Sequence, residues 1–450
     1  MPKIVFMGAG SSVFVKNVVG DCMLDDALQD SEFALYDIDP VRLEDSRRML
    51  EALRRNMGCK AVITSYLGAE HRREALRGAK YVINAIQVGL YRPCTVTDFE
   101  VPRRFGLRQT IGDTLGIGGI FRALRTIPVL EDFARDITEE CPDAWFLNYT
   151  NPMAILTGYM QRFTPVKTVG LCHSVQVCAK RLLEGLGMDD DPAIRTLIAG
   201  INHQAWLLDI RDRDGNDLYP EIRRRAAART EKHADMVRYE IMKRFGYYTT
   251  ESSEHNAEYV PFFIKDKYPE LIDRFNIPLD EYPRRCEKNI VKWVTQRDEL
   301  TNNPELRHEL SREYASHIIA AMETNTPLQD RRQCDQQRAD SQPAGGGLRG
   351  GALPGGWQRR DAVPCGKSAR AVRRPQPRLH QCAAADHSGG KNAAEGLYLS
   401  GRHDGPAPAK RAVHRRYCRP VRRDDRGARR LAAGIHLTKA ARSSAASGQG

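Results

Sequence analysis

The chain has 450 residues, 41% of them hydrophobic, which is enough for two domains, and no stretch approaches the roughly 20 apolar residues of a membrane span. The eleven cysteines are scattered and form no C-x-x-C pair, which excludes a disulfide framework and is typical of the reduced thiols of a cytoplasmic protein. The net charge of +12 comes from residues 331–450, which hold 25 Lys and Arg against 8 Asp and Glu. Residues 1–330 are slightly acidic, with 44 Lys and Arg against 49 Asp and Glu. They are therefore not expected to bind nucleic acid.

The N-terminal residues have the pattern of a βαβ unit. The apolar strand KIVFM runs into a turn at Gly8, Gly10 and Ser11, a helix follows from Val13, and a second strand ends at Asp37. The N–H groups of such a turn suit a pyrophosphate, and an acidic side chain at Asp37 suits ribose hydroxyls. The pattern therefore indicates NAD binding. The third glycine of the usual G-x-G-x-x-G fingerprint is replaced by Val13, so a structural tight turn stays an alternative.

Three further strands are expected within residues 80–89, 144–153 and 168–172. Strands that alternate with helices predict an α/β fold with a doubly wound, Rossmann-type parallel sheet. Ligands of such sheets bind outside the carboxyl ends of the strands. Each of these strands ends in polar, turn-forming residues, so we expect an active site along that edge.

Two polar residues near this edge are candidates for binding substrate hydroxyls. Asn151 precedes Pro152, which holds the asparagine extended so that its amide can project into a site. Asp113 lies on a glycine-flanked turn before a helix. A turn asparagine and a helix-capping aspartate are the structural alternatives.

Cys172 and His203 each follow or precede a predicted strand. A thiolate and a neutral imidazole suit a divalent ion with positions left open for substrate oxygens. Spacing alone favours the alternative, a buried cysteine and a hydrogen-bonded histidine.

The chain resembles glycoside hydrolase family 4 in a set of motifs taken together: GAGSS, YDID, QVG, GDTLG-x-GG, LNYTNPM, GLCHSVQ, AGINH and TESSEH-x-AEY. The CHSV variant is similar to the α-galactosidase (melibiase) branch of this family. The resemblance runs from Pro2 to about Pro327. It implies a Rossmann domain joined to an α+β domain like that of lactate and malate dehydrogenases. It also implies bound NAD, a divalent ion, usually Mn²⁺, and homo-oligomers such as dimers or tetramers.

The resemblance further implies hydrolysis of α-galactosides such as melibiose by oxidation, elimination, water addition and reduction, an exception to the two-carboxylate rule of glycosidases. By motif, Cys172 and His203 correspond to metal ligands, Asn151 holds substrate hydroxyls near the ion, and Tyr259 corresponds to the base. A core aromatic is the alternative for Tyr259. His173 stands where phospho-glucosidase relatives have an aspartate acid, so it either protonates the leaving oxygen or shapes the pocket.

We expect an NAD-binding domain at 1–195 and a partial domain for substrate, metal and oligomerisation at 196–330. The alternative enzyme on the same fold is an NAD-dependent 2-hydroxy acid dehydrogenase. It predicts an arginine for the substrate carboxylate and an Asp/His proton relay.

Residues 331–450 form a basic low-complexity tail with 17 Gly, 8 Pro and one Ile, and with neither Phe nor Met. This composition predicts disorder, because it cannot bury enough apolar surface to offset chain entropy. One interpretation is a frameshift, since a GC-rich gene read in the wrong frame gives such a sequence. The other is a genuine nucleic-acid-binding tail. If residues 331–450 stand in place of the strand-and-helix pattern that completes the second domain of the family, poor solubility and little or no activity are expected.

Overall fold

The N-terminal part of the protein is built on a six-stranded parallel sheet. The computed structural model describes residues 1–326, and all of them fall within one unit of the chain. The predictions for residues 331–450, both the frameshift and the nucleic-acid-binding tail, lie outside the described residues. The strands are β1 (Lys3–Met7), β2 (Glu32–Asp37), β3 (Val62–Leu67), β4 (Tyr81–Asn84), β5 (Trp145–Asn148) and β6 (Lys167–Gly170).

The strand order, β3-β2-β1-β4-β5-β6, is that of a Rossmann sheet, so the predicted doubly wound α/β fold is confirmed. Alternate residues of β1 face opposite sides. Ile4 and Phe6 pack with the helices α1 and α2, whereas Val5 and Met7 pack with α5 and α6. Burial on both faces explains why this strand is apolar throughout.

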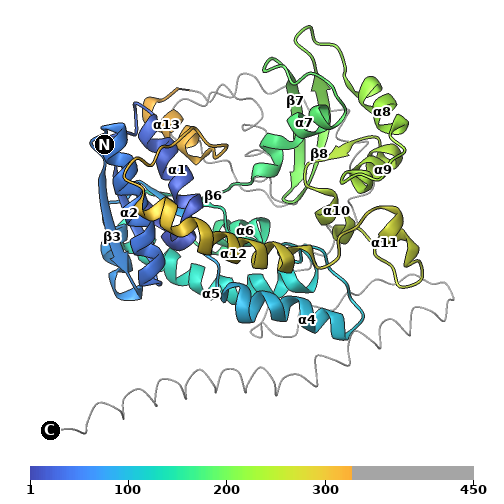
Figure 1. Ribbon diagram of the computed structural model, residues 1–450. Coiled ribbons are helices and arrows are strands. Elements are labelled where there is room, and N and C mark those ends of the chain that lie inside the picture. Colours follow the sequence, from blue (N-terminus) through green and yellow to red (C-terminus); the bar gives the residue numbers. More distant parts are fainter. Residues whose placement is uncertain (327–450) are drawn as a thin grey trace, which may run out of the picture. The chain divides into compact units, whose positions relative to one another are not determined.

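The helices that surround this sheet follow the strands in sequence (Figure 1). They are α1 (Val13–Leu24), α2 (Pro40–Met57), α3 (Arg72–Leu76), α4 (Val96–Arg104), α5 (Gly116–Glu140), α6 (Met153–Phe163) and α7 (His173–Gly185), with shorter helical turns η1 (Ala9–Ser11), η2 (Ala69–His71) and η3 (Leu90–Thr95). No helix within residues 1–326 combines the length and the apolar character that crossing a membrane requires.

A second, antiparallel sheet follows α7. Its strands are β7 (Arg195–Ile201), β8 (Gln204–Arg211) and β9 (Tyr248–Thr249), in the order β7-β8-β9. Its helices are α8 (Tyr219–Ala228), α9 (Met236–Phe245), α10 (Ser253–Tyr259), α11 (Glu270–Arg274), α12 (Glu281–Asn302) and α13 (Ala315–Thr324). The predicted α+β character of this part is confirmed in the described residues.

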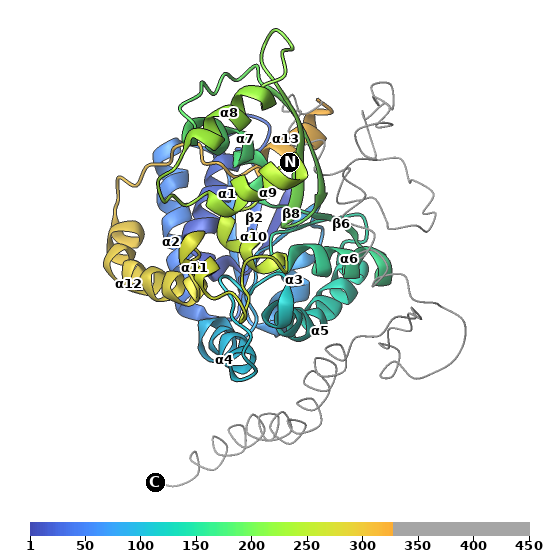
Figure 2. The ribbon, with the colours of Figure 1, turned by 90° about the vertical axis from the view of Figure 1, so that its right-hand side faces the viewer.

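The end of the described chain returns to the first sheet. The long helix α12 lies beside α2 (Figures 1 and 2), and Tyr314 and Ile319 belong to the same apolar core as β1 and α1. The side chain of His308 is buried, and its Nε2 lies 2.7 Å from Oδ1 of Asp21 on α1. A Cβ on Gly20 would lie 2.7 Å from the His308 ring, so glycine provides the space for this contact. The division at residue 195 stays a prediction.

Candidate active site

The glycine turn after β1 brings the chain very close to two other strands. Gly8 has φ +88°, and a Cβ there would lie 2.8 Å from the backbone oxygen of Ala85, just beyond β4. The backbone N–H of Gly10 donates to Oδ2 of Asp37 at 2.6 Å. The other oxygen, Oδ1, accepts from the backbone N–H groups of Ile38 and Asp39 at 2.8 and 2.9 Å. Asp37 is therefore held by three backbone donors at the end of β2.

The residues of this turn fit a dinucleotide. The hydroxyl of Ser11 is buried and has no hydrogen-bond partner among the described residues, which leaves it free for a ligand. A carboxylate has about four acceptor sites, so Asp37 keeps one for a ribose hydroxyl after binding three N–H groups. Gly8, Gly10, Ser11 and Asp37 thus lie together at the carboxyl ends of β1 and β2, where NAD was predicted to bind.

A cluster of side chains that could hold a metal ion is formed by the segments after β6, between β7 and β8, and after β9. Cys172 is the N-cap of α7, and His203 occupies the turn between β7 and β8. Their ligand atoms and a carboxylate oxygen of Glu251 all lie within 4.8 Å of one another. His203 Nε2 is 3.7 Å from Oε2 of Glu251. A thiolate, an imidazole and a carboxylate are a fitting set of donors for a borderline divalent ion.

The hydrogen bonds around His203 leave one ring nitrogen for this cluster. The Thr114 hydroxyl donates to Oδ1 of Asp113 at 3.0 Å and lies 2.8 Å from Nδ1 of His203. Because a hydroxyl has a single hydrogen, it must accept from Nδ1–H. In the neutral ring the lone pair of Nε2 is directed toward Glu251 and Cys172, where a metal ion would take the place of the Nε2 proton. Such a hydrogen bond on the opposite nitrogen is how proteins orient histidine ligands.

Negative charge accumulates around His203. Burial lowers the pKa of His203, but Cys172, Glu251 and Asp113 outweigh burial and raise this pKa to about 10. Burial raises the pKa of Asp113, yet Arg122, His255 and His203 outweigh it and lower this pKa. The Asp113 carboxylate is thus an acceptor, and the cluster attracts a cation.

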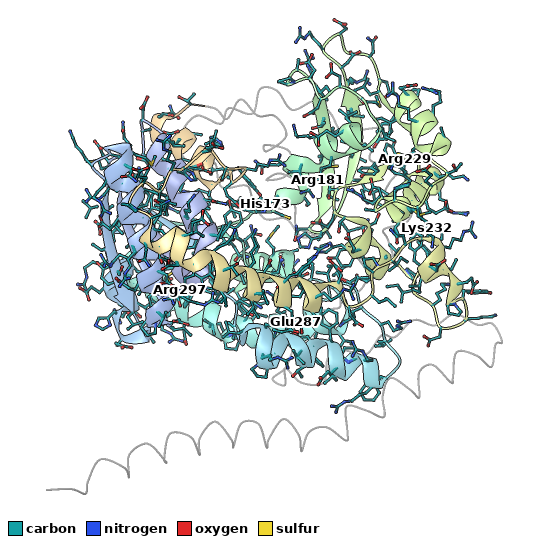
Figure 3. All side chains as sticks on the ribbon, viewed as in Figure 1. His173, Arg181, Arg229, Lys232, Glu287 and Arg297 are labelled. Carbon is teal, nitrogen blue, oxygen red and sulfur yellow. The ribbon has the colours of Figure 1, made fainter. Side chains whose placement is uncertain are left out.

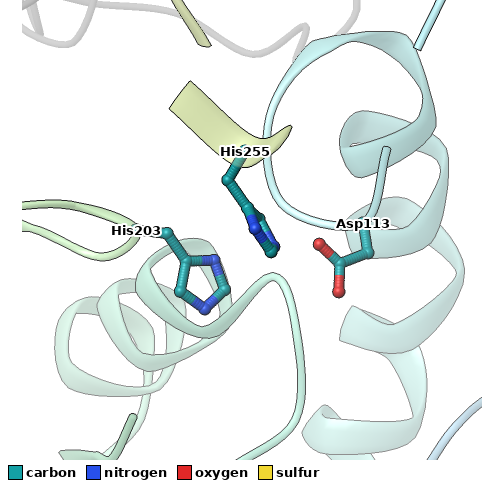
Figure 4. Close-up of side chains that lie close together, drawn as sticks. All are labelled: Asp113, His203 and His255. Carbon is teal, nitrogen blue, oxygen red and sulfur yellow. The ribbon is translucent and has the colours of Figure 1, made fainter. Parts of the chain in front are cut away.

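His255 extends the cluster on the side of α10. Ligand atoms of Asp113, His203 and His255 also lie within 4.8 Å of one another, and Figure 4 shows the three side chains pointing toward one another. The His255 Nδ1 is bound to the Ser252 hydroxyl at 2.8 Å. Burial lowers the pKa of His255, which favours the neutral imidazole.

The two predicted substrate-binding residues are brought together. Nδ2 of Asn151 donates to Oδ2 of Asp113 at 3.0 Å, although the two residues are 38 positions apart. Asp113 is neither a helix cap nor a lone turn residue, because its carboxylate faces Asn151, Thr114 and the histidines. Both side chains therefore lie beside the metal-binding cluster.

Tyr259, the predicted base, ends α10 with its hydroxyl 3.4 Å from Nδ1 of His203. Its phenol thus lies at the cluster and not among the core aromatics. Burial, Asp113 and Glu258 raise the pKa of Tyr259 well above its ordinary value. A role as base therefore requires a cation nearby that lowers this pKa again.

His173, labelled in Figure 3, has other side-chain partners than its neighbour Cys172. Its Nε2 is 2.6 Å from Oε2 of Glu313, and its ring is surrounded by Phe14, Tyr149 and Tyr314, with ring centroids 6.0 to 6.5 Å away. Phe14 belongs to the first turn of α1, so His173 faces the glycine turn at Gly8–Ser11, called the nucleotide turn below. Cys172 and His173, although adjacent in sequence, thus contact different groups of residues.

The sequence did not single out several residues of the site. Glu251 and His255 belong to the motif TESSEH, and ligand atoms of both lie within 4.8 Å of His203. Glu258 is the least expected. Its carboxylate accepts backbone N–H groups from Thr110, Ile111 and Gly112 at 2.8 to 3.2 Å and so fixes the loop before Asp113. Such long-range contacts leave no local signal.

Two family models match the chain: Family 4 glycosyl hydrolase over residues 3–188, and Family 4 glycosyl hydrolase C-terminal domain over residues 198–331. The chain belongs to glycosyl hydrolase family 4. As a member of this family it is a glycosidase, and the predicted resemblance is confirmed. The predicted enzyme class is therefore correct, and family membership argues against the dehydrogenase alternative.

Relatives in family 4 include an α-galactosidase of Bacillus subtilis (strain 168), 63% identical over 329 residues that cover 73% of this chain and 75% of the relative. An α-galactosidase of Rhizobium meliloti (strain 1021) is 34% identical, with 72% and 67% covered. Among solved structures, a 6-phospho-α-glucosidase from gut microorganisms in complex with NAD and Mn²⁺ has a TM-score of 0.56 at 18% identity, with 72% of this chain and 74% of that chain covered. This last likeness shows that the fold is shared.

Proposed function

We propose that this family 4 glycosidase hydrolyses α-galactosides such as melibiose with the help of NAD and a divalent ion, Mn²⁺ first among them. The observation that carries the proposal is the meeting of Cys172, His203 and Tyr259, which come from three distant segments, in one buried cluster. The 63% identical relative, an α-galactosidase, supports the galactoside as substrate. The complex of a family member with NAD and Mn²⁺ supports the cofactors.

The cofactors have defined places in this proposal. Cys172 and His203, together with Glu251, would hold the metal. Gly8, Gly10, Ser11 and Asp37 would hold NAD. When bound, NAD supplies a reversible oxidation at the third carbon of the sugar, and the metal polarises the hydroxyls next to it.

The side chains of the chain bind the sugar and move its protons. Asn151 and Asp113, already joined by a hydrogen bond, would bind the sugar hydroxyls that face the metal. Tyr259 would remove the proton from the second carbon. His173 either donates a proton to the leaving oxygen or shapes the pocket, and Glu313 holds its ring in place. Most of these side chains are buried, which excludes competing water.

We also propose that the enzyme is a cytoplasmic homo-oligomer, a dimer or a tetramer. The seven cysteines among residues 1–326 are all free thiols, as expected in a reducing compartment. Light scattering of the purified chain measures the oligomer size.

Turnover of p-nitrophenyl α-galactoside by the full chain, loaded with NAD⁺ and Mn²⁺, tests the proposed function. Release of nitrophenol without net formation of NADH is expected, because the oxidation is reversed within each cycle. Reduction of free NAD⁺ by a 2-hydroxy acid, without cleavage of the galactoside, would replace this proposal with the dehydrogenase.

A further inference from the structure

The first turns of α5 pack directly against the loop that carries Asp113. A Cβ on Gly118 would lie 2.4 Å from the backbone oxygen of Gly112, and a Cβ on Gly119 would lie 2.5 Å from the backbone of Thr114. Only glycine allows this approach. The loop is therefore seated on the helix, and the next side chains along α5 lie close to Asp113.

Two arginines on α5, three positions apart, differ sharply in their partners. Arg125 binds the Asp98 carboxylate with both terminal nitrogens, at 2.8 and 2.5 Å, and donates from Nε to the backbone oxygen of Val88 at 3.0 Å. Its hydrogen-bonding capacity is nearly saturated. Arg125 therefore has a structural role, joining α5 to α4 and to the segment after β4.

Arg122 has no comparable partners although it is more than nine-tenths buried, with 7% of its surface exposed. Among residues 1–326 its guanidinium makes one hydrogen bond, a long one of 3.4 Å from Nη1 to the Tyr282 hydroxyl. No carboxylate of these residues lies within 4.0 Å of its nitrogens. A guanidinium has five N–H donors, and Arg122 uses few of them within the fold, where it also lies 5.7 Å from the centre of the Tyr282 ring. A bound ligand would accept the remaining donors.

Arg122 follows Gly118 and Gly119 by four and three residues, so it lies on the face of α5 that packs against the loop of Asp113. No nitrogen of Arg122 lies within 4.0 Å of a carboxylate oxygen of Asp113, so the two side chains form no direct ion pair.

We propose that Arg122 is a substrate-binding residue that, with Asp113, grips a hydroxyl of the non-reducing sugar and selects a neutral hexoside over a uronide. Arg122 donates to the hydroxyl oxygen while Asp113 accepts the hydroxyl hydrogen. The charges of Arg122 and Asp113 balance each other. A sugar carboxylate placed at this pair would therefore bring a negative charge that the pair does not compensate. This inference rests on the proposed function and extends it to the choice of substrate.

The test compares the binding of methyl α-galactoside to the full chain and to Arg122→Met, both loaded with NAD⁺ and Mn²⁺, by calorimetry. Loss of charge-assisted hydrogen bonds is expected to raise Kd roughly 10- to 100-fold, with NAD affinity unchanged. A set of monodeoxy galactosides then identifies the hydroxyl. The deoxy sugar that lacks this hydroxyl should bind the wild type more weakly than methyl α-galactoside does. Arg122→Met should bind the same deoxy sugar and methyl α-galactoside with equal affinity, as in a double-mutant cycle.

Arg122→Lys provides a second variant if the methionine variant does not fold. It keeps the charge but lacks the planar fork, so an intermediate loss of affinity is expected. Arg125→Met is the matched control from the same helix. It should lower the melting temperature, while the folded fraction keeps its affinity for the galactoside.

Three results would overturn the inference, and they are distinguishable. Equal affinity of wild type and Arg122 variants, or equal losses with every deoxy sugar, would leave Arg122 without a substrate contact. Tighter binding of methyl α-galacturonide than of the galactoside, lost in Arg122→Met, would show that the arginine binds a carboxylate. A wild type that binds no galactoside at all would refute the proposed function, and this inference with it.

Discussion

The nucleotide turn and the charged cluster lie at the same edge of the sheet but are completed in different ways. In the turn, three backbone N–H groups satisfy Asp37, and the Ser46 hydroxyl donates to the backbone oxygen of Ala9 at 2.6 Å. In the cluster, ligand atoms of Cys172, His203 and Glu251 lie within 4.8 Å of one another, and Arg122 makes one long hydrogen bond. Hydrogen bonds of the chain itself hold most of the turn, whereas the cluster collects side chains that suit a bound ligand.

This difference separates the expected consequences of substitution. A change in the turn disturbs hydrogen bonds that belong to the fold, so stability and NAD affinity should fall together. A change in the cluster removes a ligand contact and relieves crowded charge, so activity should fall while the fold persists. Functional sites often retain such unfavourable arrangements at the expense of stability.

The largest effect is expected from Cys172→Ser. Loss of the thiolate should reduce galactoside cleavage by more than about 1,000-fold and weaken Mn²⁺ binding, because a neutral serine hydroxyl is a weaker ligand than an anionic thiolate. NAD affinity should stay within a few-fold, since the turn is untouched. Metal titration by calorimetry and an NAD binding assay measure the two quantities.

Cys141→Ala is the control for Cys172→Ser, because Cys141 is an equally buried thiol in the opposite core. It should lower stability slightly and leave metal binding intact. Unchanged activity of Cys172→Ser would remove the metal site from this cluster.

The second largest effect is expected from substituting His173, which lies between the nucleotide turn and the cluster. If His173 protonates the leaving oxygen, His173→Asn should slow cleavage of methyl α-galactoside roughly 100-fold, because an alkoxide needs a proton. Cleavage of p-nitrophenyl α-galactoside should change far less, because nitrophenolate leaves without one. Equal losses on both substrates would assign His173 to shaping the pocket.

Gly8→Ala tests the turn. The positive φ and the approach to Ala85 mean that a methyl group strains the backbone and clashes with an atom that cannot move aside. We expect a loss of roughly 2 to 5 kcal/mol of stability together with weaker NAD binding. Thermal melting with and without NAD measures both. An alanine variant that melts like the wild type would contradict the structural role of this turn.

Glu258→Gln should have the smallest effect, a change in stability that depends on pH. Burial raises the pKa of Glu258 to about 7 from 4.5, so the folded chain binds this proton more tightly than the unfolded chain does. The resulting stabilisation is present below about pH 4.5 and is lost as the pH rises through 7. Relative to the wild type, the glutamine variant should therefore gain up to about 3 kcal/mol between pH 5 and 8. Melting curves that stay parallel across this range would contradict the shift.

Regular strands and motif-bearing residues were predictable from the sequence. The strand KIVFM was placed at its observed bounds because burial on both faces makes it continuously apolar. The expected strand in 80–89 ends at Asn84, so Gln87 and Gly89 lie in the following turn. β3 went unpredicted, because as an edge strand it exposes Val62 and Leu67 and has no apolar run.

Site residues that lie in a recognisable motif were predictable from the sequence. Site residues that act through contacts between distant segments were not. Asp113, Asn151 and His203 were named from their turns, and the structure brings them together. Arg122 and Glu313 were missed, because an arginine on a helix and a glutamate before one have no local feature that predicts burial beside a distant loop. Their partners are 140 or more positions away in sequence.

The most direct test of the account is cleavage of an α-galactoside in D₂O by the chain loaded with NAD⁺ and Mn²⁺. If Tyr259 removes the proton of the second carbon and solvent later replaces it, the released galactose carries one deuterium at that carbon. The Tyr259→Phe variant should lose this incorporation together with activity. Galactose released with ordinary hydrogen at the second carbon would contradict the oxidation and elimination route, and with it the assignment of the cluster.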